Sequence, residues 1–557
     1  MADSIQFRRG LRSTVKALPI GMPGFVEDEE RLVIGKGDGT NAELPNKADM
    51  DNVNSQMADI ATIFINNYKF LASSNDWTSA INKAISDLPT NGGRIIFGNQ
   101  RYNISGKISI TKNNVSLEGV LSRDGLGGTQ LFMTEDNLSD ESLIEIVGTN
   151  NDTKRVLGGS LKNISILGAE YQRGNQFNDI ASHPQRNNSA ILNKDTSFFD
   201  FHNVFVYGFS HIGVNFDGAY DGFIENLDVQ YCGTDGIYPS VNLTSTDSDC
   251  ANALKFIGLH IEFTNYFLNL EHSSRHNQFI ACKFEAGNNN LNTHSMITCD
   301  NTLENVFSAC QFVYGNKNVP LFNCNYSHIA LIGRCMLTSG GVIYDENNIG
   351  ALFVYSRNGS IIIDSCIIDN IYADSYSFDI DSDSIFTNNH IFATPKNSTF
   401  NIVKINGNRT TISNNKIINV SNTNTITTGS LFYCTNSGNV IKNNSINGKY
   451  YKEYSADSAY LLYNIYKSFL SNISITYTTG ATINSDHNSI ILSYTNNEQI
   501  NTISGGFNGK EITIISTNNN VTITNNNNIR TKGGTNLVMN ANTPIKFFNV
   551  YGTWFEM

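Results

Sequence analysis

Five charged residues recur on three five-residue segments that have the pattern of stacked strands. The segments are Asn226-Leu-Asp-Val-Gln230, Gly258-Leu-His-Ile-Glu262 and Ala281-Cys-Lys-Phe-Glu285, and they carry Asp228, His260, Glu262, Lys283 and Glu285. Two carboxyl groups can act as general acid and as base or nucleophile at a glycosidic bond. We predict Glu262 as the acid and either Asp228 or Glu285 as its partner. His260 and Lys283 are predicted to contact the substrate.

The distances between these side chains follow from strand geometry if the segments stack in parallel. Neighbouring strands lie ~4.8 Å apart, and alternate residues of one strand ~6.6 Å apart. Glu262 and Glu285 would be one strand spacing apart, close to the ~5 Å of retaining glycoside hydrolysis. Asp228 and Glu262 would lie on a diagonal of roughly 8 Å, within the inverting range. Repulsion raises the pKa of one of two stacked carboxyl groups, and nearby Lys283 and protonated His260 offset this effect.

The same face has alternative interpretations. A charge-balanced row of side chains is also typical of a solvated surface or of a contact between subunits. On a substrate that contains uronic acid, β-elimination would replace hydrolysis, with His260 or Lys283 as the base. The spacing of the carboxylates matches no recognisable metal motif, so we predict no metal site and no cofactor.

Four further residues are predicted to bind substrate. Tyr207 and Gln230 occupy the fifth, outward position of their segments, whereas Glu271 and Arg275 lie in a connection between two segments and could line a groove. Aromatic rings stack on sugars, but they also pack between subunits. Both roles are open for Tyr207 and for the other tyrosines of this region, Tyr220, Tyr231 and Tyr238.

The segments that carry these residues belong to a longer series of repeats. Its members begin 23 to 32 residues apart, at Asn203, Asn226, Gly258, Ala281, Ala309, Gly333 and Ser365. Their second and fourth positions are apolar in almost every member, and Arg334 is the exception. Because side chains alternate between the two faces of a strand, these positions should point inward and the third and fifth outward.

Two further series lie between these segments. One reads apolar-polar-apolar, as in Val214-Asn-Phe216, Leu268-Asn-Leu270, Ile297-Thr-Cys299 and Phe322-Asn-Cys324, and the other begins at Ile224, Phe256, Phe279, Phe307 and Leu331. Three strands in each turn indicate a parallel β-helix. Farther on, an asparagine recurs at one corner, where each amide can bond to the next turn; we interpret Asn389, Asn415, Asn444 and Asn472 as structural.

The two ends of the chain differ from the repeats. A run of apolar residues spaced 3, 4, 3 and 4 apart predicts either a short dimeric or trimeric coiled coil or one amphipathic helix packed on the first turn: Met50, Val53, Met57, Ile60 and Phe64. From about residue 486, strands such as Gly509-Lys-Glu-Ile-Thr-Ile-Ile515 alternate with Asn/Gly turns. This pattern predicts a separate, β-structured C-terminal cap.

Composition excludes several classes of protein. The net charge of −12 over 557 residues opposes binding to nucleic acid or to an anionic membrane, since both attract clustered Lys and Arg. No stretch approaches the ~20 apolar residues of a membrane span. The nine cysteines are odd in number and show no Cys-x-x-Cys spacing, so we expect small buried residues rather than disulfides or a zinc site.

Motifs near the N-terminus resemble those of phage tail fibres and spikes, in which they attach the protein to the virion: Ile5-Gln-Phe-Arg-Arg-Gly10, Gly21-Met-Pro-Gly-Phe25, Arg31-Leu-Val-Ile-Gly35 and Gly37-Asp-Gly39. The next stretch resembles the entry of pectate-lyase-like phage β-helices, a capping helix followed by the first coils: Asp76-Trp-Thr-Ser-Ala-Ile-Asn-Lys-Ala-Ile85, Gly92-Gly-Arg-Ile-Ile-Phe97, Tyr102-Asn-Ile104 and Val115-Ser-Leu-Glu-Gly119. The usual Gly-Asp-Gly with a following Asp-Asp is degenerate here, so the resemblance rests on the later motifs and the repeats.

The resemblance implies an all-β tailspike with a right-handed parallel β-helix of three strands per coil. The implied domains are a virion-attachment segment (1–47), a helical or coiled-coil neck (48–75), the β-helix (76–485) and a C-terminal trimerisation cap (486–557). Such spikes are homotrimers of the virion, assembled in the host cytoplasm and joined to other tail proteins by the first segment. They bind, and many degrade, exopolysaccharide, capsule or wall teichoic acid.

Two questions stay open under this resemblance. The alternative to a depolymerase is a non-catalytic receptor-binding spike that recognises the same polymer. If the polymer is teichoic acid, the carboxylates could hold a divalent cation that polarises a phosphodiester. No nucleic-acid partner and no membrane insertion are expected.

Overall fold

The structure is a computed structural model, and it describes most of the chain beyond residue 60 and four short strands before it. The described residues are 8–10, 23–26, 31–35, 41–43, 61–121, 127–134, 141–148, 155–168, 188–233, 238–245, 250–264, 266–285, 295–314, 319–338, 352–371, 376–393, 401–419, 426–434, 439–447, 450–456, 460–461, 465–466, 476–477, 482–485, 489–492, 494, 496–506, 508–519 and 521–557.

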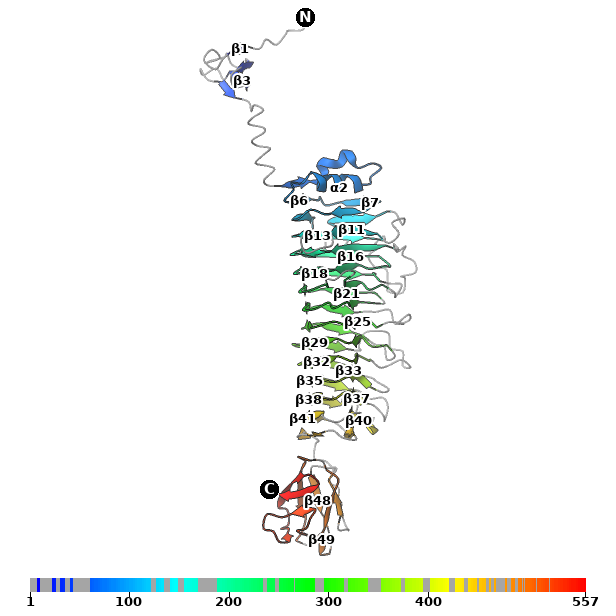
Figure 1. The fold of residues 1–557 in the computed structure, drawn as a ribbon, viewed down its shortest axis with the longest axis vertical. Helices are drawn as coiled ribbons and strands as arrows, with labels where there is room; N and C mark the ends of the chain where they lie inside the picture. Colours follow the sequence, from blue (N-terminus) through cyan, green and yellow to red (C-terminus); the bar gives the residue numbers. More distant parts are fainter. Residues whose placement is uncertain are drawn as a thin grey trace.

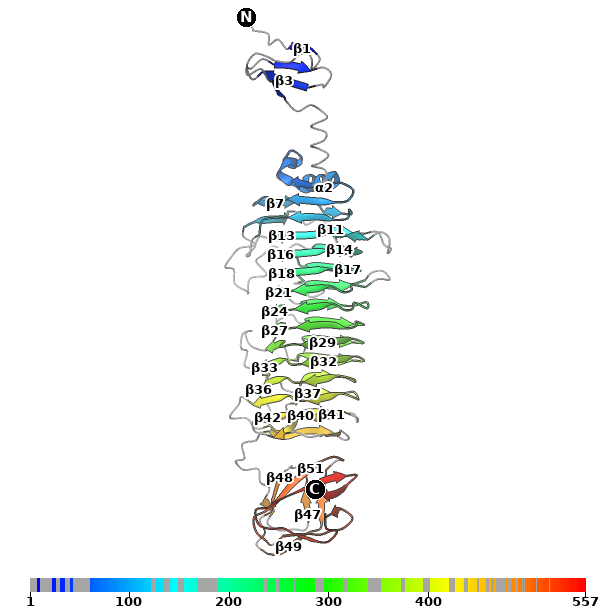
Figure 2. The ribbon, with the colours of Figure 1, turned by 90° about the vertical axis from the view of Figure 1, so that its left-hand side faces the viewer.

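The molecule is dominated by two large sheets of parallel strands stacked along one axis (Figures 1 and 2). The 13-stranded sheet contains β8 (Ile108–Ile110), β11 (Ser142–Val147), β14 (Ser189–Lys194), β17 (Val214–Asp217), β19 (Val241–Thr244), β22 (Leu268–Leu270), β25 (Ile297–Asp300), β28 (Phe322–Asn325), β31 (Val354–Arg357), β34 (Tyr376–Ile380), β37 (Asn401–Ile405), β40 (Ile426–Cys434) and β43 (Tyr450–Ala456).

The 26-stranded sheet contains β5 (Thr62–Phe64), β6 (Gly93–Ile96), β7 (Arg101–Ile104), β9 (Val115–Glu118), β10 (Thr129–Met133), β13 (Ser160–Leu167), β16 (Asp200–Tyr207), β18 (Phe223–Gln230), β20 (Lys255–Ile257), β21 (His260–Glu262), β23 (Gln278–Ile280), β24 (Lys283–Glu285), β26 (Asn305–Ser308), β27 (Gln311–Val313), β29 (His328–Ile332), β30 (Met336–Thr338), β32 (Ser360–Asp364), β33 (Ile367–Ile371), β35 (Ile385–Thr387), β36 (His390–Ala393), β38 (Thr411–Ser413), β39 (Lys416–Asn419), β41 (Val440–Lys442), β42 (Ser445–Asn447), β44 (Tyr460–Leu461) and β45 (Ile465–Tyr466).

The order of pairing identifies the architecture. Strands three positions apart in the chain pair in parallel: β20 with β23, β21 with β24, and β22 with β25. The chain therefore advances by one strand spacing each time it returns to the same sheet. This arrangement confirms the predicted parallel β-helix.

The interior is filled by the apolar columns that the repeats predict. In every repeat of the first series except the one that begins at Gly333, the predicted inward residues are buried, among them Val204, Val206, Leu227, Val229, Leu259, Ile261, Cys282 and Phe284. Phenylalanine rings stack in register on successive turns, with ring centroids 4.8 Å apart for Phe256 and Phe279 and 4.5 Å for Phe279 and Phe307. Dense apolar packing of this kind is the main stabilisation of a solenoid.

One repeat was predicted in the wrong register. In the segment that begins at Gly333, the buried residues are Cys335 and Leu337, so the inward positions are shifted by one residue from the prediction. Arg334 has a φ of 70° and occupies the left-handed corner that Ala309 and Ser365 occupy in neighbouring repeats. The corner residue points away from the core, which explains why a charged side chain is tolerated there.

A column of cysteines continues into a column of asparagines at this corner. The thiols of Cys310, Cys335 and Cys366 donate to main-chain carbonyls of the preceding turn over 3.2 to 3.3 Å. The amides of Asn389 and Asn415 donate to the equivalent carbonyls and also to the next asparagine of the column, over 2.9 to 3.0 Å. The structural role predicted for Asn389, Asn415 and Asn444 is confirmed, whereas Asn472 lies outside the described residues.

The cysteines are buried, as predicted. The eight whose side chains the structure describes are all buried. Among the described residues, no helix combines the length and apolar character needed to cross a membrane.

The N-terminal side of the β-helix is closed by short helical elements. Helix α2 (Thr78–Asp87) buries Ala80, Ile81, Ala84 and Ile85 against the first turn, and the 3-10 helix η1 (Ile65–Leu71) precedes it. Strand β5, which falls in the predicted neck, pairs with β6 of the 26-stranded sheet. Met50, Val53, Met57 and Ile60 lie outside the described residues.

Two smaller β-structures lie at the ends of the chain. The first is a four-stranded sheet of β1 (Arg8–Gly10), β2 (Pro23–Val26), β3 (Arg31–Gly35) and β4 (Asn41–Glu43). The second has its own hydrophobic cluster, which runs from Ile483 to Trp554. Its largest sheet contains β46 (Thr476–Tyr477), β48 (Ser489–Leu492), β51 (Glu511–Ser516), β53 (Ile529–Arg530), β55 (Pro544–Val550) and β56 (Thr553–Glu556).

Candidate functional site

The predicted charged residues do share one outward face of the β-helix. Asp228 of β18 pairs with His260 of β21, which pairs with Lys283 of β24. In the adjacent column Gln230 pairs with Glu262, and Glu262 with Glu285. We call Asp228, His260, Glu262, Lys283 and Glu285 the charged cluster.

His260 is the centre of the charged cluster. Its Nδ1 lies 3.5 Å from Asp228 Oδ1, and its Nε2 lies 3.3 Å from Glu285 Oε1 and 3.6 Å from Glu262 Oε2. The Lys283 ammonium also bonds to Glu285 Oε1. Gln230 Nε2 donates to Asp228 Oδ1 over 3.2 Å. Residues predicted to act on a substrate therefore contact one another.

Burial and mutual repulsion perturb the charged cluster. Burial, followed by the negative charges of Glu285 and Asp228, raises the pKa of Glu262 to about 7 against the opposing charge of His260. Burial lowers the pKa of His260, but the hydrogen bond and charge of Asp228 and the charge of Glu262 more than offset this, and the net shift is upward. Near neutral pH, a proton is therefore held on or between these two side chains.

Three members of the charged cluster have the composition of a cation site. Ligand atoms of His260, Glu262 and Glu285 all lie within 4.8 Å of one another. Imidazole and carboxylate groups bind divalent transition metals. The Lys283 ammonium already bonds to Glu285, so a cation would have to displace it.

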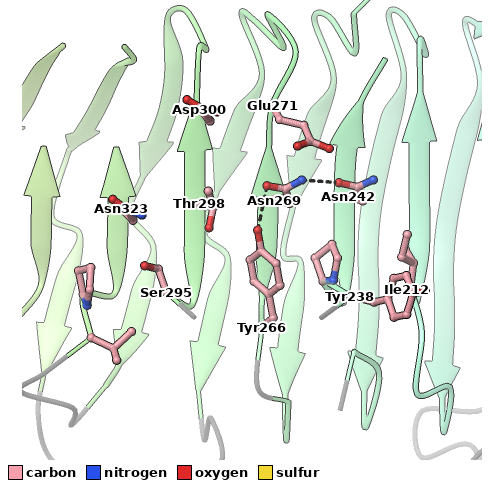
Figure 3. Close-up of a pocket in the computed structure, with 13 residues that line it drawn as sticks. Ile212, Tyr238, Asn242, Tyr266, Asn269, Glu271, Ser295, Thr298, Asp300 and Asn323 are labelled. Atoms are coloured by element: carbon pink, nitrogen blue, oxygen red, sulfur yellow. Dashed lines mark hydrogen bonds between the residues drawn. The ribbon is translucent and has the colours of Figure 1, made fainter. Parts of the chain in front are cut away.

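A groove lies on the 13-stranded sheet, on other residues of the same turns (Figure 3). Its volume is about 660 Å³. It is lined by Ile212, Tyr238, Pro239, Asn242, Tyr266, Asn269, Glu271, Ser295, Thr298, Asp300, Val319, Pro320 and Asn323. We call this concavity the groove.

The floor of the groove is an outward row of amides and a hydroxyl. Asn242, Asn269, Thr298 and Asn323 are paired in register on β19, β22, β25 and β28. Asn269 Nδ2 donates to Asn242 Oδ1 over 2.9 Å, and the Tyr266 hydroxyl donates to Asn269 Oδ1 over 2.8 Å (Figure 3). These bonds hold the floor in one arrangement, which suits a surface that recognises a partner without reorganising.

Two carboxylates stand on neighbouring strands in the groove. Glu271 directly follows β22, and Asp300 is the last residue of β25. The Thr244 hydroxyl donates to Glu271 Oε1 over 3.0 Å, and Asn325 Nδ2 donates to Asp300 Oδ1 over 3.0 Å. The other oxygen of Glu271, Oε2, lies 3.8 Å from His272 Nε2, and Asp300 is exposed.

Aromatic rings accompany the polar floor. The Tyr238 ring lies against the His211 ring, with centroids 4.1 Å apart and the ring planes tilted by 37°, and Tyr266 is almost fully buried beside Asn269. Aromatic faces next to hydrogen-bonding groups are the usual composition of sugar-binding surfaces, because a pyranose ring has both apolar faces and hydroxyl edges.

The structure divides the predicted substrate-binding residues. Glu271 lines the groove, and Arg275 is exposed outside its lining. The prediction for Tyr207 is wrong: its side chain is 3% exposed and packs with Leu167, Phe205 and Tyr231. Tyr207 does point outward from the helix, but a second hydrophobic cluster covers this part of the face.

Asp300, Asn242 and Tyr266 were not singled out from the sequence. Asn242 fits the apolar-polar-apolar series as the middle residue of Val241-Asn-Leu243, whereas Tyr266 and Asp300 lie just outside the triplets 268–270 and 297–299. The signal for Asn242 could therefore have been found. It was weak because amides and hydroxyls on an outward strand face are common on any solvated sheet.

Comparisons with known proteins add the following findings. Neither the family models searched nor the curated proteins searched match the chain. Among solved structures, ORF18 of Geobacillus virus E2 is 15% identical with a TM-score of 0.37, covering 83% of this chain and 74% of its own. DFA-IIIase of Arthrobacter chlorophenolicus A6 in complex with DFA-III is 11% identical with a TM-score of 0.39, covering 68% and 94%.

A third similar structure is PfbA, a surface adhesin of Streptococcus pneumoniae. It is 13% identical with a TM-score of 0.36, covering 72% of this chain and 93% of its own. All three similar structures have identities of 15% or less and TM-scores below 0.5.

Proposed function

We propose that this chain is a phage tailspike that binds a bacterial surface glycopolymer in the groove and cleaves it by hydrolysis. The single observation that carries the proposal is the groove itself. It combines a hydrogen-bonded row of amides with tyrosine rings and two carboxylates on successive parallel strands.

The repeat of the floor suits a polymer. Asn242, Asn269, Thr298 and Asn323 occupy four neighbouring strands, so the floor repeats every ~4.8 Å along the helix axis. Over three such steps the row extends for about 14 Å, which is the length of a few sugar residues. An extended chain lying along the axis can meet equivalent groups at each step.

The remaining parts of the proposal rest on the resemblance of the sequence to phage tailspikes. Residues 1–47 would attach the chain to other tail proteins of the virion, and residues 486–557 would join three chains into a homotrimer. Exopolysaccharide, capsule and wall teichoic acid are the polymer classes considered. No cofactor is proposed for hydrolysis of a glycosidic bond. If the polymer is teichoic acid, a divalent cation could take part.

The second candidate function is a receptor-binding spike without catalysis. The polar groups on the floor of the groove already bond to one another, as Asn269 does to Asn242 and Tyr266. A rigid floor of this kind is sufficient for adhesion alone.

The experiment that separates the two functions uses the full chain and purified surface polymers of candidate hosts. Binding is measured by co-sedimentation or biolayer interferometry, and cleavage by the release of reducing ends or phosphate. Binding with fragment release supports the depolymerase, and binding without release supports the adhesin. Absence of binding to every polymer contradicts both.

A further inference from the structure

The groove contains a carboxylate pair to which the sequence assigned no catalytic role. We infer that Glu271 and Asp300, rather than Glu262 with Asp228 or Glu285, cleave the glycan, and that the glycan is uncharged where it is cut. This inference rests on the proposed function, since it names the reacting groups and the substrate class of the same site.

The groove offers space for a glycan beside its carboxylates. Glu271 and Asp300 line a groove of about 660 Å³ beside Tyr266 and Thr298. No member of the charged cluster is among the residues that line it. Glu262 and Glu285 of the charged cluster face His260 over 3.6 and 3.3 Å, and Glu285 also bonds to Lys283, whereas Glu271 Oε2 lies 3.8 Å from His272 Nε2. A general acid must be within hydrogen-bonding reach of the substrate oxygen, and a glycan that occupied the groove would lie beside this pair.

The carboxyl groups of Glu271 and Asp300 are held apart by their hydrogen-bond partners. Leu270 and Cys299 are paired, so Glu271 and Asp300 follow at the same level, about one strand spacing of ~4.8 Å apart at the main chain. Glu271 bonds to Thr244 on the strand before it, and Asp300 bonds to Asn325 on the strand after its own. The carboxylates are thus drawn apart, and Figure 3 shows Glu271 turned toward the Asn242 side.

This separation favours an inverting reaction. Carboxyl groups roughly 6.5 to 9.5 Å apart leave room for a water molecule between the base and the anomeric carbon. Asp300, which is exposed, would act as the base and take a proton from that water molecule. The oxygen of the water molecule forms a bond to the anomeric carbon at the same time. The bond to the leaving oxygen breaks, and the more enclosed Glu271 gives that oxygen its proton. Exchange with solvent then restores both groups.

The charge of the groove bears on the class of substrate. Among the described residues, the lining of the groove contains two carboxylates and no lysine or arginine. A uronate or phosphate group placed between Glu271 and Asp300 would be repelled by both. A neutral polymer has no such cost, so the groove favours hexoses or N-acetylated hexosamines at the cleavage site over polyuronate or teichoic acid.

The test compares substitutions in the full chain. Glu271→Gln and Asp300→Asn are expected to lower the cleavage of a neutral bacterial exopolysaccharide by about 10²- to 10⁴-fold while binding changes little. Glu304→Gln and Asp383→Asn, both on exposed sites outside the groove, are the matched controls and should cleave normally. Unchanged melting temperatures exclude misfolding. The wild type should release the inverted anomer, read by proton NMR of fresh product.

The outcomes separate this inference from the proposed function. The panel contains neutral exopolysaccharides, polygalacturonate and wall teichoic acid. If the wild type cleaves but Glu271→Gln and Asp300→Asn cleave equally well, the pair is wrong and the depolymerase stands. Loss of cleavage in Glu262→Gln alone would assign catalysis to the charged cluster. Faster cleavage of an anionic polymer overturns the substrate class, and no cleavage of any polymer overturns the inference and the depolymerase together.

Discussion

The charged cluster and the groove lie on the same turns of the β-helix, but their polar groups have different surroundings. In the charged cluster, His260 touches three carboxylates and Lys283 neutralises one of them. In the groove, the carboxylates of Glu271 and Asp300 are held by Thr244 and Asn325 beside an open volume. Density of charge and access to a ligand are therefore separate properties, and only the second identifies a place for substrate.

The largest expected effect comes from filling the groove. Thr298 lies outward on β25 at the centre of the floor, so Thr298→Trp should leave the core intact and lower polymer affinity by about 100-fold or more, roughly 2.7 kcal/mol. Gln311→Trp places the same ring on the outward face of β27, next to the charged cluster, and should bind normally. If both variants lost polymer affinity equally, the polymer would contact both the groove and the face of the charged cluster. The two regions would then not differ in access to the polymer.

Removing the centre of the charged cluster should affect folding more than function. His260→Ala leaves Asp228, Glu262 and Glu285 without their shared partner, and we expect a loss of about 1 to 2 kcal/mol in the free energy of unfolding. Urea unfolding followed by circular dichroism measures this loss. Polymer cleavage by the folded variant should be normal, and loss of cleavage without loss of stability would make the charged cluster functional.

The pH dependence of stability should also arise from the charged cluster. The pKa of Glu262 is raised to about 7 and that of His260 is raised as well, so the folded chain holds protons that the unfolded chain has released. Stability should therefore be greatest below about pH 4.5 for the Glu262 contribution and decline as pH rises through about 7.

The substitution Glu262→Gln isolates this contribution. It should flatten the decline and stabilise the protein at pH 8 by an amount on the order of 1 kcal/mol, because the carboxylate no longer has to ionise among like charges. The urea midpoint between pH 5 and pH 8 is the measurement, with Glu304→Gln as control. An unchanged slope in Glu262→Gln would show that Glu262 does not titrate near neutral pH.

The smallest expected effect concerns one hydroxyl in the groove. Tyr266→Phe removes the donor to Asn269 Oδ1 while keeping the ring, so polymer affinity should fall by roughly fivefold, about 1 kcal/mol. Tyr433→Phe, at an exposed position outside the groove, should have no effect. If Tyr266→Phe binds as well as the wild type, the hydroxyl is only structural.

The sequence was sufficient to predict the columns of the β-helix but not its open surfaces. Inward positions such as Leu259 and Phe284 follow from the alternation of side chains along a strand, which is a local property of the sequence. The pairing of His260 with Asp228 and Lys283 followed from the same register. The groove depends on how the connections between strands fold, and their lengths vary from turn to turn.

Two errors show where local rules end. Tyr207 obeys strand alternation but is covered by Phe205 and Tyr231, which are contributed by other positions of the surface. Arg334 looked like a misfit of the core because the corner residue was placed one position early; its φ of 70° shows that it belongs to the turn. Both errors reflect tertiary packing that acts on a correctly identified strand.

The corner column of cysteines and asparagines has a consequence for how such a protein can change in length. Each thiol or amide donates to the main-chain carbonyl at the equivalent position of the turn before it. Where the cysteines give way to asparagines, the Cys366 main-chain N–H donates to Asn389 Oδ1 over 2.9 Å. Cysteine and asparagine both fit this corner position and make the same hydrogen bond to the turn before it. A whole turn can therefore be inserted, deleted or exchanged between relatives without a new kind of contact between turns. The corner contacts thus stay the same from turn to turn, while the residues on the outward faces can vary.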